Sequence, residues 1–224
     1  MPECLVGKSY KHNLNKSGLK ELLFSSYTLT VVSEFTGISV NGHTFGMAEG
    51  FPSTGFTGAK FALSVSGQAS NYTWDNGGSS WVMVDDSGNV AFTAKGNSTL
   101  VTITATPKVG GAPLTYTFSV NTWFINNGST VMPWSDASNW CTAQGLTLPR
   151  GGDMTKGMNV RGMGSLWSEW GRMVNYSGSG FISGNYWTPE PSGSDSHNIV
   201  LLYSGIVSSS YDIDDNSVVC RQGL

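Results

Sequence analysis

The sequence contains few charged residues, few histidines and few cysteines, and it has no long apolar run. Charged residues make up 12% of the 224 residues and the formal net charge is -3, which argues against a nucleic-acid-binding protein because such proteins present a basic face. The three histidines are widely spaced and lack cysteine neighbours at ligand spacing, so we expect no zinc site. No run of about 18 apolar residues is present, and we expect no membrane-spanning helix.

The N-terminus also lacks a secretory signal, because no basic segment followed by an apolar one occurs there. If the protein is exported, we therefore expect this chain to be a fragment. What the sequence does contain is 29 glycines and many Ser, Thr and Asn residues between apolar ones. This composition favours an extracellular β-rich protein, and the length suits two domains of about 100 residues each.

Short alternating segments follow one another between residues 37 and 120, and each is typical of a strand. They are Ile38–Val40, Lys60–Val65, Tyr72–Trp74, Val82–Val84, Val90–Phe92, Leu100–Ala105 and Leu114–Val120. Turn residues such as Asn41-Gly42 separate them. This spacing predicts a Greek-key β-sandwich. Tyr27–Ser33 also has a strand pattern, within a leader over residues 1–35 that we interpret as disordered or as the remnant of a preceding segment.

Two helices are expected in the second half. Pro133 and Asp136 suit the first turn of one helix, and Gly145 supplies its C-terminal stop. Its buried stripe would hold Ala137, Trp140, Cys141 and Gln144. A second helix is predicted over Ser165–Val174, with an apolar face of Leu166, Trp167, Trp170, Met173 and Val174.

Short strands separated by a long polar loop are predicted for the rest of the chain. The strand segments are Tyr186–Pro191, His197–Tyr203, Gly205–Val207 and Val218–Cys220. We expect Trp74, Trp134 and Trp167 to be core residues, whereas Trp187 could pack beneath the long loop or belong to a binding surface.

The two halves of the chain each resemble a known type of domain. Tyr72-Thr-Trp74, the valine-rich stretch Val82–Val90 and the alternating Val101–Ala105 resemble a bacterial Ig-like domain, over residues 36–121. A helix that carries Cys141, then Leu-Thr-Leu-Pro149, then a final strand with Cys220 resembles a C-type-lectin-like domain, over residues 122–224. The fold expected from the resemblance is mostly β with an α+β module: an Ig-like sandwich followed by a lectin-like domain with two short helices.

The order of the two modules is similar to that of the intimin and invasin family of bacterial outer-membrane adhesins. The resemblance implies a disulfide between Cys141 and Cys220, which leaves Cys4 as the odd cysteine. It also implies an extracellular module at the bacterial cell surface that binds a receptor and has no enzymatic activity. We expect the signal and membrane anchor to lie outside this chain. A junction at Val120–Phe124 without a flexible linker predicts two modules that pack rigidly together.

The sequence argues against a calcium site and against a hydrolase active site. Calcium-dependent C-type lectins use acidic triplets, but this chain has Glu190-Pro191-Ser192 at one position and Val207–Ser209 at the other. We therefore expect no metal and no cofactor. Ser194-Asp195-Ser196-His197 contains the residue types of a hydrolase, but adjacency on one loop does not provide their spatial relay.

The contact patch is expected on the loops near the last strands, at Glu190, Asp195, His197, Tyr211 and Asp212. The leading hypothesis is an adhesin tip that binds a host cell-surface or immune protein. The alternatives are a lectin that binds glycans without calcium and a structural cap on an adhesin stalk. Integrin-binding relatives rely on an aspartate soon after the first lectin-domain cysteine, whereas here no acid occurs between Cys141 and Asp153, so integrin recognition by that mode is not expected.

Overall fold

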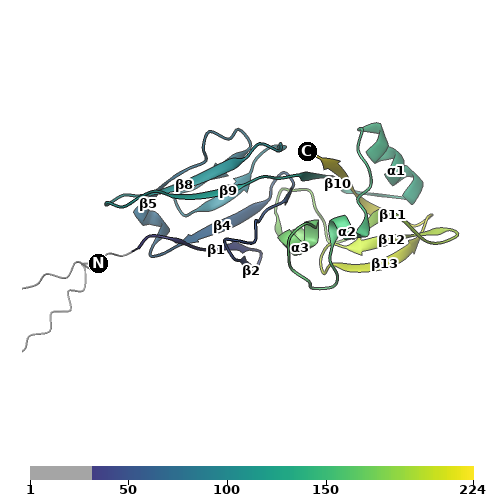
Figure 1. Cartoon of the computed structure of the whole chain (residues 1–224). Coiled ribbons are helices and arrows are strands. Elements are labelled where there is room, and N and C mark those ends of the chain that lie inside the picture. Colours follow the sequence, from purple (N-terminus) through teal and green to yellow (C-terminus); the bar gives the residue numbers. More distant parts are fainter. Residues whose placement is uncertain (1–31) are drawn as a thin grey trace, which may run out of the picture. The chain divides into compact units, whose positions relative to one another are not determined.

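Two antiparallel sheets are built from the alternating segments between residues 35 and 118 (Figure 1). The structure is a computed structural model that describes residues 32–224, so Cys4 and most of the predicted Tyr27–Ser33 strand lie outside the described residues. One sheet has the order β2-β1-β4-β7-β6 and the other has the order β5-β8-β9. The strands of the first are β1 (Phe35–Val40), β2 (His43–Phe45), β4 (Lys60–Val65), β6 (Val82–Val84) and β7 (Asn89–Phe92). Those of the second are β5 (Tyr72–Asp75), β8 (Val101–Pro107) and β9 (Leu114–Phe118).

Every strand predicted between residues 37 and 120 is present, because period-two burial is a direct consequence of strand geometry. In β8, for example, Val101, Ile103 and Ala105 are buried and the residues between them are not. The sequence did not predict β2, which pairs with β1 across Asn41-Gly42. Both turn residues have positive φ, 47° and 78°, as the tight hairpin turn requires.

The third sheet joins the two halves of the chain. Its order is β13-β12-β11-β14-β10-β3. The strands are β3 (Thr54–Gly55), β10 (Thr122–Met132), β11 (Asn185–Gly193), β12 (Ser196–Leu201), β13 (Ile206–Tyr211) and β14 (Asn216–Gly223). β3 comes from the first half of the chain and pairs in parallel with the start of β10. A Cβ on Gly55 would lie 2.5 Å from Cζ3 of Trp123, so only glycine allows this approach.

We use "sandwich module" for residues 36–121 and "C-terminal module" for residues 122–224; this boundary stays a prediction. Residues 32–224 form one compact unit, in which aromatic side chains of the two modules pack directly together. The ring centroids of Phe51 and Trp170 are 4.9 Å apart, and those of Phe56 and Tyr176 are 5.1 Å apart.

A buried carboxylate connects the modules as well. Glu169 is 0% exposed and accepts hydrogen bonds from the backbone N–H groups of Ser53 (3.1 Å), Thr54 (2.9 Å) and Gly164 (2.6 Å). It also accepts from the hydroxyls of Thr54 (2.7 Å) and Ser53. A buried carboxylate is tolerated only with such donors around it. The junction is therefore held by polar as well as apolar contacts.

The predicted helix after Pro133 is α1 (Trp134–Ala143), and the chain leaves it through Gly145 at φ 69°. Its buried stripe is narrower than expected. Ala137 and Cys141 are fully buried, but Gln144 is exposed, because it is the C-cap and lies beyond the last helical residue.

The helix predicted over Ser165–Val174 is wrong in length. α3 (Leu166–Trp170) ends at Gly171, whose φ of 72° and N–H bond to the Trp167 carbonyl close the last turn. Met173 then lies in a separate 3-10 turn, η2 (Met173–Asn175). A further short helix, α2 (Gly151–Met154), was not predicted. None of the helices within residues 32–224 is long and apolar enough to cross a membrane.

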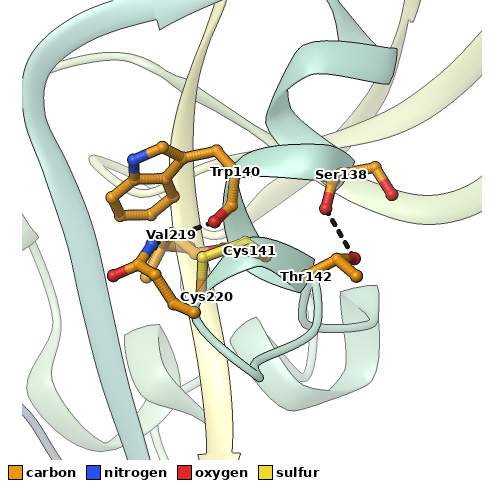
Figure 2. The surroundings of a disulfide bond; sticks show 7 residues. Ser138, Trp140, Cys141, Thr142, Val219 and Cys220 are labelled. Atoms are coloured by element: carbon orange, nitrogen blue, oxygen red, sulfur yellow. Dashed lines mark hydrogen bonds between the residues drawn. A yellow bond between two sulfur atoms is a disulfide. The ribbon is translucent and has the colours of Figure 1, made fainter.

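The disulfide between Cys141 and Cys220 is present and joins α1 to β14 (Figure 2). Both cysteines are 0% exposed, and their sequence separation is 79. They belong to a second apolar cluster that includes Trp187 and Val218. The prediction of this bond is confirmed, and it fixes the helix against the last strand of the sheet.

Candidate functional site

The predicted long polar loop between Trp187 and His197 is instead a β-hairpin. β11 and β12 pair with Pro191 opposite His197 and with Gly193 opposite Ser196. The register shifts on both sides of Pro191, and such irregularities accommodate a residue that has no N–H to donate. The serine- and glycine-rich composition suggested a loop, but it forms the end of a hairpin.

His197 lies in a three-residue cluster rather than on an open loop. Its ring is stacked on the indole of Trp134, with centroids 3.7 Å apart and an interplanar angle of 8°. Nδ1 of His197 lies 2.6 Å from Oδ1 of Asp212, and because a carboxylate only accepts, this nitrogen carries the proton. The His197 side chain is 13% exposed and that of Asp212 is 31% exposed. Both residues therefore have a structural role.

Trp134 connects three segments of the C-terminal module. Its backbone N–H donates to the carbonyl of Asp212 (3.0 Å), and its indole N–H donates to the carbonyl of Thr188 (2.9 Å). The prediction that Trp134 is a core residue is only half right, since it is partly buried and its ring face is covered by His197. Its role could not be found from sequence, because its partners are far away in the chain.

The cluster predicts a measurable cost for removing His197. His197→Ala would uncover the Trp134 ring and leave the Asp212 carboxylate without its donor. We expect the free energy of unfolding to fall by about 1 to 2 kcal/mol. Chemical denaturation measures this loss. Asp195→Ala is the matched control at the hairpin turn; its side chain is exposed, and we expect a change within about 0.5 kcal/mol. Equal effects of the two substitutions would contradict a structural role for His197.

The other predicted site residues divide into two groups. Asp195 lies at the hairpin turn, where its carbonyl accepts the N–H of Asp212 (2.9 Å). Tyr211 follows on the neighbouring strand and is 68% exposed. Glu190 is different, because both its carboxylate oxygens accept from the N–H of Gly151 (3.2 and 3.3 Å) at the start of α2. The structure thus brings Asp195, His197, Tyr211 and Asp212 together and leaves Glu190 engaged elsewhere.

Two neighbours of this group lie in the same acidic loop but were not among the individually predicted site residues. Ile213 is 84% exposed, although isoleucine is usually buried. Asp214 accepts from the N–H of Tyr211 (3.0 Å) and from the hydroxyl of Ser210 (2.9 Å), which holds the turn between β13 and β14. An isoleucine inside the acidic run Asp212–Asp215 was the available signal.

We call this surface the acidic tip; its residues are Asp195, Tyr211, Asp212, Ile213, Asp214 and Asp215. Between Arg172 and Arg221 the sequence has no lysine or arginine. The carboxylates of the acidic tip therefore have no lysine or arginine from the hairpins that carry them, and His197 is bonded to that of Asp212. The surface offers negative charge beside an exposed aromatic ring and an exposed aliphatic side chain.

No group of three or more metal-ligating side chains occurs within residues 32–224. Val207–Ser209, at the position of a calcium-binding triplet, lies within β13. Ser194 donates to the carboxylate of Asp195 (3.2 Å), whereas His197 is bonded to Asp212. The hydrolase-type residues at the hairpin therefore do not form a relay among themselves.

Asp153, the first acid after Cys141, is also engaged. Its carboxylate accepts the N–H of Arg150 (2.9 Å) and lies 3.5 Å from Nε of Arg221. These contacts fix the chain at the start of α2 next to β14. Asp153 therefore has a structural role in holding α2 against β14.

The chain is similar to known proteins in sequence. The family model for invasin, domain 4, matches residues 36–118. The inverse autotransporter adhesin YeeJ of Escherichia coli (strain K12) is 39% identical over 174 residues, which are 75% of this chain and 7% of that protein. Invasin of Yersinia enterocolitica is 32% identical over 176 residues, which are 77% of this chain and 21% of invasin. The chain thus spans a small part of these relatives.

Solved structures of related proteins are similar to this chain as well. A crystal structure of invasin, described as a bacterial integrin-binding protein, has a TM-score of 0.78 and 28% identity, covering 88% of this chain and 40% of that one. A 282-residue C-terminal fragment of intimin, in complex with the intimin-binding domain of the translocated intimin receptor, has a TM-score of 0.63 and 18% identity, covering 85% and 65%. The second likeness shows the fold alone. The predicted fold class, an Ig-like sandwich followed by a C-type-lectin-like module, is confirmed.

The relatives found by sequence are adhesins and not enzymes. Similarity in sequence covers three quarters of the chain, and similarity in structure extends over both modules. The chain contains an invasin domain 4 and is homologous to bacterial adhesins of the invasin type.

Proposed function

We propose that this chain is the receptor-binding part of an adhesin displayed at the bacterial cell surface, and that it binds a host protein through the acidic tip. The observation that carries the proposal is the pairing of two exposed apolar side chains, Tyr211 and Ile213, with carboxylates at the turn they share. Tyrosine is enriched among residues that dominate binding energy, and a charged rim adds specificity.

The support beneath the acidic tip is rigid. Asp212 is bonded to His197 and to the backbone of Trp134, while Asp214 closes the turn through Tyr211. A surface that is already ordered loses little conformational entropy when a partner binds. This arrangement suits recognition better than a mobile polar loop would.

The charge of the acidic tip indicates the chemistry of the partner. Asp195, Asp214 and Asp215 are exposed, and the sequence between Arg172 and Arg221 contains no lysine or arginine. A protein surface with lysine or arginine beside an apolar pocket would complement them. Attachment should then weaken as salt concentration rises, because exposed charges are screened within about 10 Å at 0.1 M salt.

The relatives support a protein ligand. Intimin has been crystallised with the intimin-binding domain of the translocated intimin receptor, and invasin is described as integrin-binding. In this chain Asp153 is held by Arg150 and Arg221, so the proposal does not use an aspartate after the first cysteine as the contact. We infer a host protein partner without extending either relative's receptor to this chain.

Removing the two apolar side chains of the acidic tip tests its role. The double variant Tyr211→Ser with Ile213→Ser is expected to weaken attachment to cultured epithelial cells about thirtyfold or more, the effect of losing a binding hot spot. Flow cytometry with fluorescently labelled full chain measures it. Val109→Ser is the matched control, since Val109 is 94% exposed on the sandwich module. Normal attachment of the double variant, or loss with Val109→Ser, would contradict the proposal.

A second experiment separates a protein ligand from a glycan and from a purely structural role. Trypsin treatment of the cells should abolish attachment, whereas removal of surface glycans should leave it intact. A glycan array should show no binding with or without calcium. Binding to an array would support the lectin alternative, and absence of any attachment would favour a structural cap.

A further inference from the structure

The sheet of the C-terminal module ends in an edge strand that lacks the usual protection. β13 is six residues long, whereas the other edge strands within residues 32–224 have two to five. Its sequence, Ile206-Val-Ser-Ser-Ser-Tyr211, contains no charge and no proline, and its register against β12 is unbroken. Proteins normally protect edges with short strands, charges, proline or bulges, because an open edge pairs with another strand.

The outward backbone groups of β13 can be assigned from the ladder. Asp212 donates its N–H to Asp195, and along an antiparallel strand the groups facing the neighbour alternate with those facing away. Val207, Ser209 and Tyr211 therefore direct their N–H and C=O groups away from β12. Those of Tyr211 are both bonded to Asp214, at 3.0 and 2.9 Å. The open groups that remain belong to Val207 and Ser209.

Exposed apolar side chains gather around the same edge. Of the eleven large hydrophobic residues that are exposed within residues 32–224, six lie on β13, at its ends or in the loop that Asn159 holds against Ser204 (3.0 Å). They are Met158, Val160, Tyr203, Val207, Tyr211 and Ile213. A gathering of this kind on one edge is typical of an interaction surface.

We propose that β13 pairs antiparallel with β13 of a second copy of this chain, about a two-fold axis at Ser208. In this register Val207 of each copy lies opposite Ser209 of the other, and each such pair exchanges both of its backbone hydrogen bonds. This pairing satisfies the outward N–H and C=O groups of Val207 and Ser209. It ends before Tyr211, whose own N–H and C=O groups are already bonded to Asp214. Interfaces between identical copies are commonly closed by such a two-fold axis.

The two ends of β13 complement each other in this arrangement. The two-fold axis places Tyr211 and Ile213 of one copy beside Gly205 and Tyr203 of the other. Ile213 and Tyr203 are both exposed, so this arrangement brings two exposed apolar side chains near each other.

Charges are matched as well. Lys156 follows Thr155, whose hydroxyl donates to the carbonyl of Gly205 (2.9 Å), so the backbone of this exposed lysine lies near the end of β13 that receives Asp214 and Asp215 of the second copy. This complementarity favours a second copy over a strand of an unrelated protein.

Sedimentation velocity of the full chain over a wide concentration range tests the proposal. All proteins carry Cys4→Ser, so that no intermolecular disulfide through the odd cysteine is counted. The parent chain and Ser209→Ala should form a reversible dimer. Ser209→Pro should raise the dissociation constant about tenfold or more, because the proline ring replaces an N–H that points outward. Its melting temperature should match that of Ser209→Ala, since the ladder to β12 does not use this N–H.

A charge pair at Ser208 tests the axis itself. Ser208 is exposed and would face its own copy, so Ser208→Lys alone and Ser208→Glu alone should each weaken the dimer. An equimolar mixture of the two should recover it as a mixed dimer. This test decides the matter even if Ser209→Pro fails to fold.

Three results would overturn the proposal. They are a monomer at every concentration, a dimer unaffected by a folded Ser209→Pro, and a charge-swap mixture no tighter than its components. Attachment to host cells is a separate readout, because it depends on Tyr211 and Ile213 and is measured on dilute protein. Failure of one proposal therefore leaves the other standing.

Discussion

Replacing Cys141 and Cys220 together by alanine is expected to lower the free energy of unfolding by about 4 kcal/mol. The bond closes a loop over a sequence separation of 79 residues, and in the chain-entropy model a loop of that size constrains the unfolded chain by this amount. Guanidinium denaturation of the parent and double-alanine chains measures the difference. Alanine suits the test because both positions are fully buried.

Cys4→Ser is the control for the disulfide experiment. Cys4 is the single cysteine that remains in the double-alanine variant, and its own effect must therefore be known. Its removal should change the free energy of unfolding by less than about 0.5 kcal/mol. A double-alanine chain as stable as the parent would contradict a bond that fixes α1 to β14. A large loss with Cys4→Ser would show that the cysteine pairing is different.

Removing the Glu169 carboxylate should be about as costly, at roughly 3 to 5 kcal/mol for Glu169→Ala. The backbone N–H groups of Ser53, Thr54 and Gly164 would then lose their acceptor, and that of Thr54 is buried. Because these donors come from both modules, the loss would loosen the junction. Glu169→Gln is the matched control, since its amide oxygen keeps an acceptor and the volume is unchanged. Similar stability of Glu169→Ala and the parent would show that the junction does not depend on this group.

The same carboxyl gives a pH dependence with a defined sign. Burial raises the pKa of Glu169 above its ordinary value of 4.5, against the opposing effect of its hydrogen bonds to Ser53, Gly164 and Thr54. A group with a raised folded-state pKa contributes stability that is fully present below the unfolded-state pKa and is lost as pH rises through the folded-state pKa. The parent should therefore lose stability relative to Glu169→Gln, whose amide does not titrate, as pH rises from about 4 toward neutrality. A parent that gains stability relative to Glu169→Gln over this range would contradict the raised pKa.

The sequence predicted elements whose cause is local. Alternation located the sandwich strands, and Pro133 and Gly145 bounded α1, because period and caps are properties of neighbouring residues. β3 was missed, since a two-residue strand has no period and exists only through pairing with β10. The end of α3 was missed because the apolar pattern continues beyond Gly171, where the backbone already turns.

The candidate site was predicted in composition but not in structure. His197 and Tyr211 lie on the adjoining strands β12 and β13, and Asp195 and Asp212 lie at the ends of these strands, as their positions before β14 indicated. The stacking of His197 on Trp134 joins residues far apart in sequence, and no local pattern encodes it. Glu190 was expected in the same patch because of its neighbours in sequence, yet its carboxylate is bonded to α2. That these residues contact a receptor remains a prediction.

Site-specific photo-crosslinking tests the central proposal most directly. The full chain would carry a photoreactive phenylalanine derivative in place of Tyr211, or in place of Val109 as the control, and dilute protein would be irradiated on intact epithelial cells. If the acidic tip binds a host protein, position 211 should give a discrete adduct that contains a trypsin-sensitive cell-surface protein, and position 109 should give none. An adduct from position 109 alone, or cell attachment without any adduct from position 211, would contradict the account.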